Sequence, residues 1–218
     1  MNIADIPSVY RILGREYLKH KAPVAELIKV RTNDPFHILV ATILSSRTRD
    51  ETTAKVCNKL FARVKSPADL EKLSIKEIEK LIKPIGFFHT KAKLLHKLPF
   101  VLKEKFNGKI PDNIEELCEL PGVGRKTANL VTAVAFNKPA ICVDVHVHRI
   151  CNRLGLIKTR TPFETEMKLR KILPRKYWIK WNAYLVSYGQ TICKPINPKC
   201  FACHIASFCD KTGIKNKL

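Results

Sequence analysis

Long apolar runs are missing from this sequence of 218 residues, and acidic residues are scarce. No apolar stretch approaches the roughly 20 residues that a membrane-spanning helix needs. The N-terminal segment also lacks the apolar core of a secretory signal peptide, because Asp5 and Glu16 stand among its basic residues. We therefore expect no membrane span and an intracellular location, cytoplasmic and associated with the nucleoid if the source is a prokaryote.

The scarcity of acidic residues leaves a strongly basic chain. Its 40 Lys and Arg residues outnumber 19 Asp and Glu residues, so the formal net charge is +21 at pH 7. A balance this basic predicts a polyanionic partner, with nucleic acid ahead of an anionic membrane. A merely soluble basic surface is the alternative, which we disfavour because such a surface brings non-specific binding.

Segments that could pair as strands are also lacking, which predicts an all-α protein. The apolar run 36–44 has the length and context of a buried helix. Ser66, Ser74 and Thr90 each stand where an N-cap would start a further helix. We expect five to seven short helices before residue 138.

Two later segments need a choice between structures. Residues 140–147 alternate as a strand would, yet the spacing after them predicts an extended segment and then a helix capped by Asp144. Four aromatic residues at helical spacing could stack on nucleic-acid bases, but such a stripe is more often the core side of a helix. They are Tyr177, Trp181, Tyr184 and Tyr188.

Glycine is scarce too, and two of the eight glycines lie in one short segment, Pro121-Gly122-Val123-Gly124-Arg125. Asp112 and Glu115 have the spacing of a capping box, which predicts a helix that ends near Leu120. A second helix follows from Arg125. The N–H groups of the glycine turn would then lie at a helix N-terminus, where a phosphate binds.

Lys126 is the unusual residue of the second helix. It shares a helical column with Leu130 and Val134, so we expect its side chain to point toward the apolar side. Such a lysine either extends past the apolar stripe to pair with a phosphate or is a desolvated amine that acts as a nucleophile. The turn alone leaves both interpretations open.

Half of the eight cysteines fall within one short segment, in the pattern C-x6-C-x2-C-x5-C. This cysteine array consists of Cys193, Cys200, Cys203 and Cys209. Four thiolates from one loop suit a tetrahedral zinc ion or an iron–sulfur cluster, whereas disulfides are disfavoured in a reducing compartment. Zinc sites commonly pair two short C-x2-4-C motifs, and only one occurs here. The spacing therefore favours a [4Fe–4S] cluster.

Three segments in this order resemble the endonuclease III family of the helix-hairpin-helix DNA glycosylase superfamily: residues 120–129, residues 143–149 and the cysteine array. The similarity extends from about Phe36 to Cys209. It implies a two-lobed all-α fold with a C-terminal iron–sulfur loop and a [4Fe–4S] cofactor on the array.

The resemblance also implies how the chain divides. A six-helix barrel would span residues 28–138, with the helix-hairpin-helix at about 112–136. The N-terminal helix, residues 1–27, would join residues 139–218 in the cluster domain.

The function that the resemblance implies is that of a bifunctional DNA glycosylase and abasic-site lyase in base excision repair, which removes damaged pyrimidines. In the family, the lysine matched by Lys126 attacks the sugar to form a Schiff base, and the aspartate matched by Asp144 assists. The partner would be double-stranded DNA with a damaged base or abasic site. The protein would bind it as a monomer, and no membrane would be involved. The alternatives are a mismatch-specific thymine or uracil glycosylase and a non-catalytic iron–sulfur DNA-binding module.

Further DNA contacts are implied by the same resemblance. The glycine turn, Pro121 to Arg125, would hold a phosphate beside the lesion. Arg47 and Phe87 stand where many relatives carry Gln and Leu, and they would fill the gap that a flipped base leaves. Their identity leaves the lesion spectrum and the preferred opposing base open. His146 would be either a DNA contact or a satisfied buried histidine.

Overall fold

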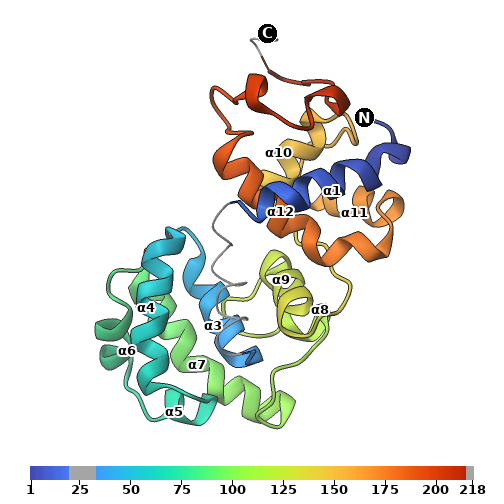
Figure 1. The fold of residues 1–218 in the computed structure, drawn as a ribbon. Coiled ribbons are helices and arrows are strands. Elements are labelled where there is room, and N and C mark those ends of the chain that lie inside the picture. Colours follow the sequence, from blue (N-terminus) through green and yellow to red (C-terminus); the bar gives the residue numbers. More distant parts are fainter. Residues whose placement is uncertain (20–32, 215–218) are drawn as a thin grey trace. The chain divides into compact units, whose positions relative to one another are not determined.

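The computed structural model describes residues 1–19 and 33–214, which form α-helices joined by turns and short 3-10 helices (Figure 1). No strand occurs in these two ranges, which confirms the all-α class. None of the helices in the described ranges has both the length and the apolar character needed to cross a membrane.

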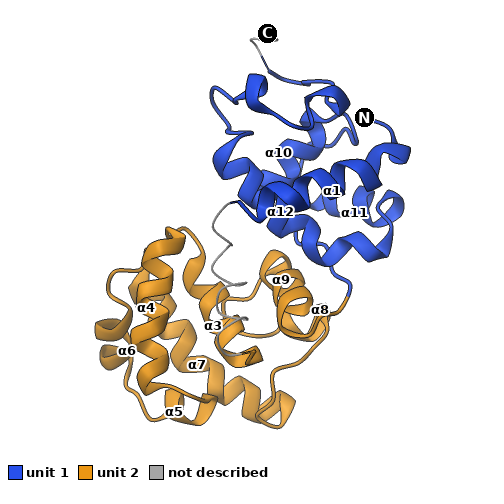
Figure 2. Ribbon diagram, in the orientation of Figure 1, with its two compact units in different colours: residues 1–23, 139–218 blue, residues 24–138 orange. Residues whose placement is uncertain are grey.

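The chain divides into two compact units (Figure 2). Unit 1 combines Met1–Pro23 with Pro139–Leu218, and unit 2 is the intervening Val24–Lys138. The division that we expected at residues 27 and 28 falls outside the described residues.

Unit 2 is built around an apolar helix, α3 (Pro35–Ser45), in which every side chain from 36 to 44 is buried. This confirms the helix expected from the apolar run. Helix α3 packs against three of the other helices, α4, α7 and α9. The remaining helices of the unit are α4 (Asp50–Arg63), α5 (Pro67–Glu71), α6 (Ile75–Ile82), α7 (Phe88–Phe106), α8 (Ile114–Leu117) and α9 (Arg125–Ala135).

Unit 1 is built around α12 (Trp178–Thr191), which packs against α1 (Ile6–Tyr17) and α10 (Val145–Arg153). Helix α11 (Pro162–Ile172) packs on α10. The aromatic stripe belongs to the core of this unit, because Trp181 and Tyr188 are almost completely buried. Tyr10 of α1 covers the stripe, with its ring centroid 4.5 Å from that of Tyr177 and 5.0 Å from that of Tyr184.

Several helix starts agree with the sequence. The side chains of Ser66, Ser74 and Asp144 accept hydrogen bonds from backbone N–H groups in the first turns of α5, α6 and α10. The described residues before 138 hold eight α-helices rather than five to seven. Helix α4 is one helix whose start the sequence does not signal, because its N-cap residue, Arg49, provides no side-chain hydrogen bond.

Two expected caps are wrong. Helix α7 begins at Phe88, so Thr90 lies inside it, and the N-cap is Phe87 in a left-handed conformation. Asp112 does not cap α8. The oxygen of the next side chain, Asn113, accepts the Glu116 N–H at 2.9 Å, while Asp112 forms an ion pair with Lys138. An amide oxygen one residue later satisfies the same free N–H groups.

Candidate functional site

Buried apolar side chains anchor the glycine turn between α8 and α9. Leu117, Leu120 and Val123 are 0%, 2% and 6% exposed. Gly122 has a φ of +76°, and a Cβ there would stand 3.0 Å from the Leu94 side chain. Both the conformation and the close approach require glycine. The turn is therefore fixed by the core of unit 2.

The N–H groups of this turn are not all available to a ligand. The Val123 N–H donates to the Leu120 carbonyl at 3.1 Å, which removes it from the phosphate clamp that we expected. Within the described residues, the N–H groups of Gly122 and Gly124 donate to no acceptor. Gly124 is the N-cap of α9 and offers no side-chain cap. Free N–H groups at a helix N-terminus favour an anion.

Lys126 is exposed, contrary to the expectation that it points toward the apolar side. The residues in its helical column become more buried along α9, since Leu130 is half-buried and Val134 is only 2% exposed. Within the part of the chain that the structure describes, no carboxylate pairs with the Lys126 ammonium. Its amine is therefore accessible to a ligand that binds at the N-terminus of α9.

Asp144 belongs to unit 1 and caps α10. Its Oδ1 atom accepts the N–H groups of His146 and Val147, each at 2.9 Å. Both bonds use the same oxygen, so the half-buried carboxylate can cap the helix and still offer Oδ2 to a ligand.

Arg47 and Phe87 lie together although they are distant in the sequence. The Arg47 guanidinium carbon is 5.4 Å from the centroid of the Phe87 ring. Both residues have a left-handed backbone, with φ of 53° and 59°. The Phe87 side chain is 62% exposed. An exposed aromatic ring under a guanidinium is the kind of pair that can enter a DNA stack.

His146 is half-buried on α10. Its Nδ1 atom lies 3.1 Å from a terminal nitrogen of Arg149, and a Cβ added at Gly189 would collide with its ring. These contacts fit a satisfied histidine inside unit 1, and a DNA contact by His146 stays a prediction.

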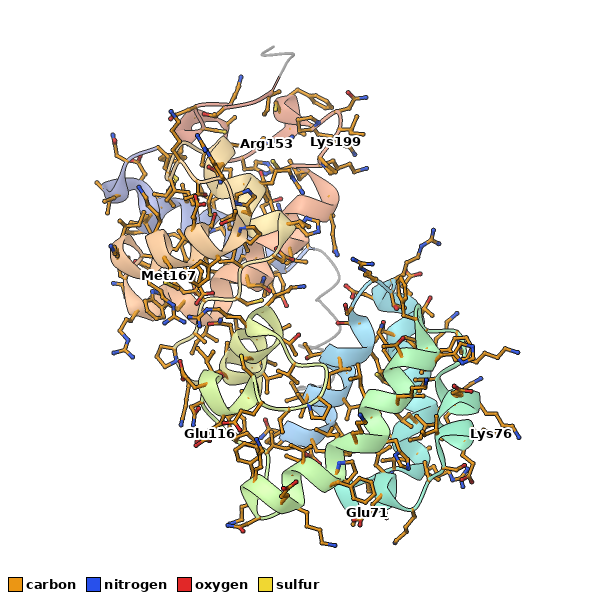
Figure 3. All side chains as sticks on the ribbon, turned by 180° about the vertical axis from the view of Figure 1, so that it is seen from behind. Glu71, Lys76, Glu116, Arg153, Met167 and Lys199 are labelled. Carbon is orange, nitrogen blue, oxygen red and sulfur yellow. The ribbon has the colours of Figure 1, made fainter. Side chains whose placement is uncertain are left out.

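The cysteine array lies beside two arginines of α10. Arg153, labelled in Figure 3, donates to the carbonyl oxygens of Lys194 and Pro195 at 2.7 and 2.8 Å. Arg149 donates to the Cys193 carbonyl at 2.8 Å. Sequence reasoning missed both arginines, although Arg149 lies inside the 143–149 segment. The two guanidinium groups thus hold residues 193–195, which begin the cysteine-bearing segment, residues 193–209.

The four thiols of the array affect one another. Burial raises the pKa of Cys203 and of Cys209, and the charges of other array cysteines raise both values further. Tyr188 donates to the Cys203 sulfur at 3.3 Å, and Arg153 donates to the Cys193 sulfur at 3.4 Å. Thiolates that repel one another at close range are stabilised by cations between them.

The donor set of the array is four cysteine thiols, all of them half-buried. Among the described residues, no group of three or more His, Cys, Asp or Glu side chains is placed so that it could hold a metal ion. Four thiolates carried by one loop are a donor set that suits a zinc ion or an iron–sulfur cluster.

The sequence also hides one charged residue in the core of unit 2. Lys91 of α7 is 6% exposed, and burial lowers its pKa to about 8. The sequence contains a signal for this burial, because Lys91 precedes Leu95 and Leu98 by four and seven residues on the apolar side of α7.

Comparisons with known proteins agree with these features. Residues 40–175 match the family model described as HhH-GPD superfamily base excision DNA repair protein. The sequence is 48% identical over 180 residues to endonuclease III of Thermotoga maritima, which covers 83% of this chain and 84% of that protein.

Two solved structures of endonuclease III–DNA complexes are also similar to this chain. A non-covalent endonuclease III–DNA complex gives a TM-score of 0.86 at 33% identity, over 97% of this chain and 96% of that one. A trapped endonuclease III–DNA covalent intermediate gives a TM-score of 0.84 at 32% identity, over 97% of each chain.

Proposed function

The chain belongs to the endonuclease III family of the HhH-GPD superfamily, and we propose from this membership that it is a bifunctional DNA glycosylase and abasic-site lyase in base excision repair. The observation that carries the proposal is the exposed amine of Lys126 on the first turn of α9, next to the glycine turn. A related enzyme has been trapped as a covalent intermediate with DNA. A nucleophilic amine is one of the groups that can form such an intermediate.

Lys126 would act on a nucleotide that has been flipped out of the helix. Its neutral amine attacks C1′, a C1′–N bond forms, and the bond to the damaged base breaks with its electron pair leaving on the base. The nitrogen lone pair then forms a C1′=N double bond while the C1′–O4′ bond of the sugar ring breaks, and O4′ keeps the electron pair and takes the proton that the amine loses, which gives an imine. Removal of a proton from C2′ then expels the 3′ phosphate by β-elimination, which cuts the strand.

Asp144 would assist as a base. Its carboxylate can take the proton of the Lys126 amine or stabilise positive charge that develops on the sugar. Neither role conflicts with the helix cap, because both cap bonds use Oδ1.

The remaining site residues would bind DNA. The N–H groups of Gly122 and Gly124 and the side chain of Arg125 would hold a backbone phosphate, which positions the strand without reading its sequence. Arg47 would bond the orphaned base, and Phe87 would stack in the gap. We expect a monomer on double-stranded DNA with a damaged pyrimidine or an abasic site.

The cysteine array would hold a [4Fe–4S] cluster. When bound, the cluster supplies four covalent cross-links to the segment and takes no part in the reaction at the sugar. The residues around it would then brace basic side chains such as Lys199, which is labelled in Figure 3, and these side chains would bind the phosphate backbone. Visible absorbance that bleaches on acidification supports this cofactor, and a colourless protein that releases zinc contradicts it.

Borohydride trapping on a duplex with one abasic site tests the enzyme. We expect a covalent adduct with the wild-type protein and none with Lys126→Ala. Arg125→Ala is the matched control, because it removes the neighbouring positive charge and keeps the amine. It should weaken binding and still give the adduct. No adduct with the wild type would leave a non-catalytic DNA-binding module, and excision of thymine opposite guanine in preference to thymine glycol would favour the mismatch-specific alternative.

A further inference from the structure

Lys91 has no role in the reaction at the sugar, yet it is a charged side chain in the core of unit 2. Its Nζ atom donates to the carbonyl oxygens of Leu44 and Ser46 at 2.8 and 2.6 Å. The Thr48 hydroxyl oxygen is a third acceptor at 3.4 Å. An ammonium group has three N–H bonds, and here it faces three oxygens.

The first two acceptors lie at the C-terminal end of α3. Ser46 is the C-cap of that helix, and the last carbonyl groups of a helix have no partner within it. A cation at this negative end is favourable. Lys91 therefore fixes the direction in which the chain leaves α3 and enters loop 45–49.

The third acceptor connects this loop to a second segment. The Thr48 hydroxyl oxygen also accepts the Gly86 N–H at 3.1 Å. A Cβ at Gly86 would stand only 2.8 Å from the Arg47 carbonyl oxygen. Loop 45–49 and the turn before α7 are thus in backbone contact, which leaves no room for either to shift independently.

The residues that these contacts hold are Arg47 and Phe87. A left-handed conformation costs a residue other than glycine of the order of 1 to 3 kcal/mol, and it persists only where the surroundings impose it. Two such residues side by side, one of them an exposed phenylalanine, need a strong support. The Lys91 contacts are the buried part of that support.

We propose that Lys91 is a positioning residue, whose ammonium sets the geometry of the Arg47–Phe87 pair and thereby the discrimination between bases opposite the lesion. The proposal rests on the proposed glycosylase function. Burial lowers the pKa of Lys91 to about 8, so the ammonium is desolvated and still protonated at neutral pH. A hydrogen bond from a desolvated charge is stronger than one between neutral groups.

Single-turnover excision of one oxidised pyrimidine placed opposite guanine or opposite adenine tests the proposal. The measured quantity is the ratio of the two rates, which cancels changes in the chemistry of Lys126. A bidentate base contact discriminates by about 1 to 3 kcal/mol, so we expect the wild-type ratio to differ from one by roughly fivefold or more. Lys91→Met should bring the ratio to within about twofold of one, and Lys91→Arg should restore part of it.

Two controls separate the possible failures. Borohydride trapping on a single-stranded abasic oligonucleotide needs no opposing base, so Lys91→Met should trap as well as the wild type. Absence of wild-type trapping on a duplex with one abasic site would reject the proposed function itself. If trapping is normal, a wild-type ratio of one or an unchanged ratio in Lys91→Met rejects the role of Lys91.

A second variant serves if Lys91→Met does not fold. Thr48→Val removes one acceptor and the bond to Gly86, while Lys91 keeps both carbonyl contacts. We expect a smaller change of the ratio in the same direction, about twofold. Because valine has nearly the shape of threonine, Thr48→Val should leave borohydride trapping on the single-stranded oligonucleotide unchanged. An unchanged ratio of the two excision rates would reject the proposal.

Discussion

Each unit contains a cation that holds the end of a helix. In unit 2, the Lys91 ammonium bonds carbonyl oxygens at the end of α3. In unit 1, the Arg149 guanidinium bonds the Gly189 carbonyl at 3.1 Å and the Cys193 carbonyl at 2.8 Å, at and beyond the end of α12. Both cations neutralise the negative end of a helix dipole.

The segments that come after these two helices differ. After α3, loop 45–49 leads directly into α4 and is fixed to the turn at Gly86. After α12, the cysteine-bearing segment has short 3-10 turns, and between residues 192 and 210 only the Ile205 side chain is buried. The lysine in unit 2 therefore completes a structure that the core already supports, whereas the arginine in unit 1 holds a segment with almost no buried side chains, which the proposed cofactor would stabilise.

Loss of the proposed cluster should produce the largest difference between the two units. In Cys203→Ser, we expect amide hydrogens from 193 to 210 to exchange about 100-fold faster, which corresponds to about 3 kcal/mol of local stability. Amides of α3 and α7 should be unaffected. Hydrogen exchange with mass spectrometry measures both. Cys118→Ser, which changes a cysteine outside the array, should leave both regions protected, and equal protection in Cys203→Ser would contradict the comparison.

The second largest effect comes from the protonation of Lys91. Its folded-state pKa of about 8 lies below its ordinary value of 10.5. Between these pH values the unfolded chain binds more protons than the folded chain, so the free energy of unfolding rises with pH. Below pH 8 the cost of burying the charge is fully present. From pH 8 to pH 10 the contribution should grow by about 2 kcal/mol.

Urea unfolding of the wild type and Lys91→Met at both pH values isolates this contribution, because the other titrating groups cancel in the difference. The same experiment with Arg149→Met should give a difference that does not change, since a guanidinium stays protonated over this range. A constant difference for Lys91→Met would contradict the assigned protonation.

The two lysines show how far helical periodicity can be used. A lysine in an apolar helical column is expected to be buried, and Lys91, for which we made no prediction, is buried well inside α7. The same reasoning is wrong for Lys126, because the first turn of α9 projects beyond the apolar core. Helical periodicity gives the direction of a side chain around the axis and does not give the depth of the helix end.

Other features divide in the same way. The buried helix α3, the Asp144 cap and the core position of the aromatic stripe follow from local patterns. The pairing of Arg47 with Phe87 does not, because it depends on two left-handed residues and a backbone contact between distant segments. The family resemblance placed both residues at the gap that a flipped base leaves, but only the fold shows that their side chains contact each other.

Replacement of the guanidinium in unit 1 should have a smaller effect. Arg149→Lys keeps the charge and loses the planar fork, so one ammonium cannot reproduce the bonds to Gly189 and to Cys193 together. A loss of about 1 to 2 kcal/mol should lower Tm by about 3 to 6 °C in a chain of this size. Arg160→Lys, at an exposed position of the same unit, is the control and should change Tm by less than about 1 °C.

The smallest effect should come from Thr48, which connects loop 45–49 to the turn before α7. Thr48→Val leaves the Gly86 N–H without its acceptor, while Lys91 retains its two carbonyl oxygens. One partly buried hydrogen bond contributes about 1 kcal/mol, so Tm should fall by about 2 to 4 °C. Thr48→Ser keeps the hydroxyl and should lose less than half of that. Equal losses in the two variants would mean that the methyl group, rather than the hydroxyl, stabilises the loop, and the polar connection between the two segments would then be discarded.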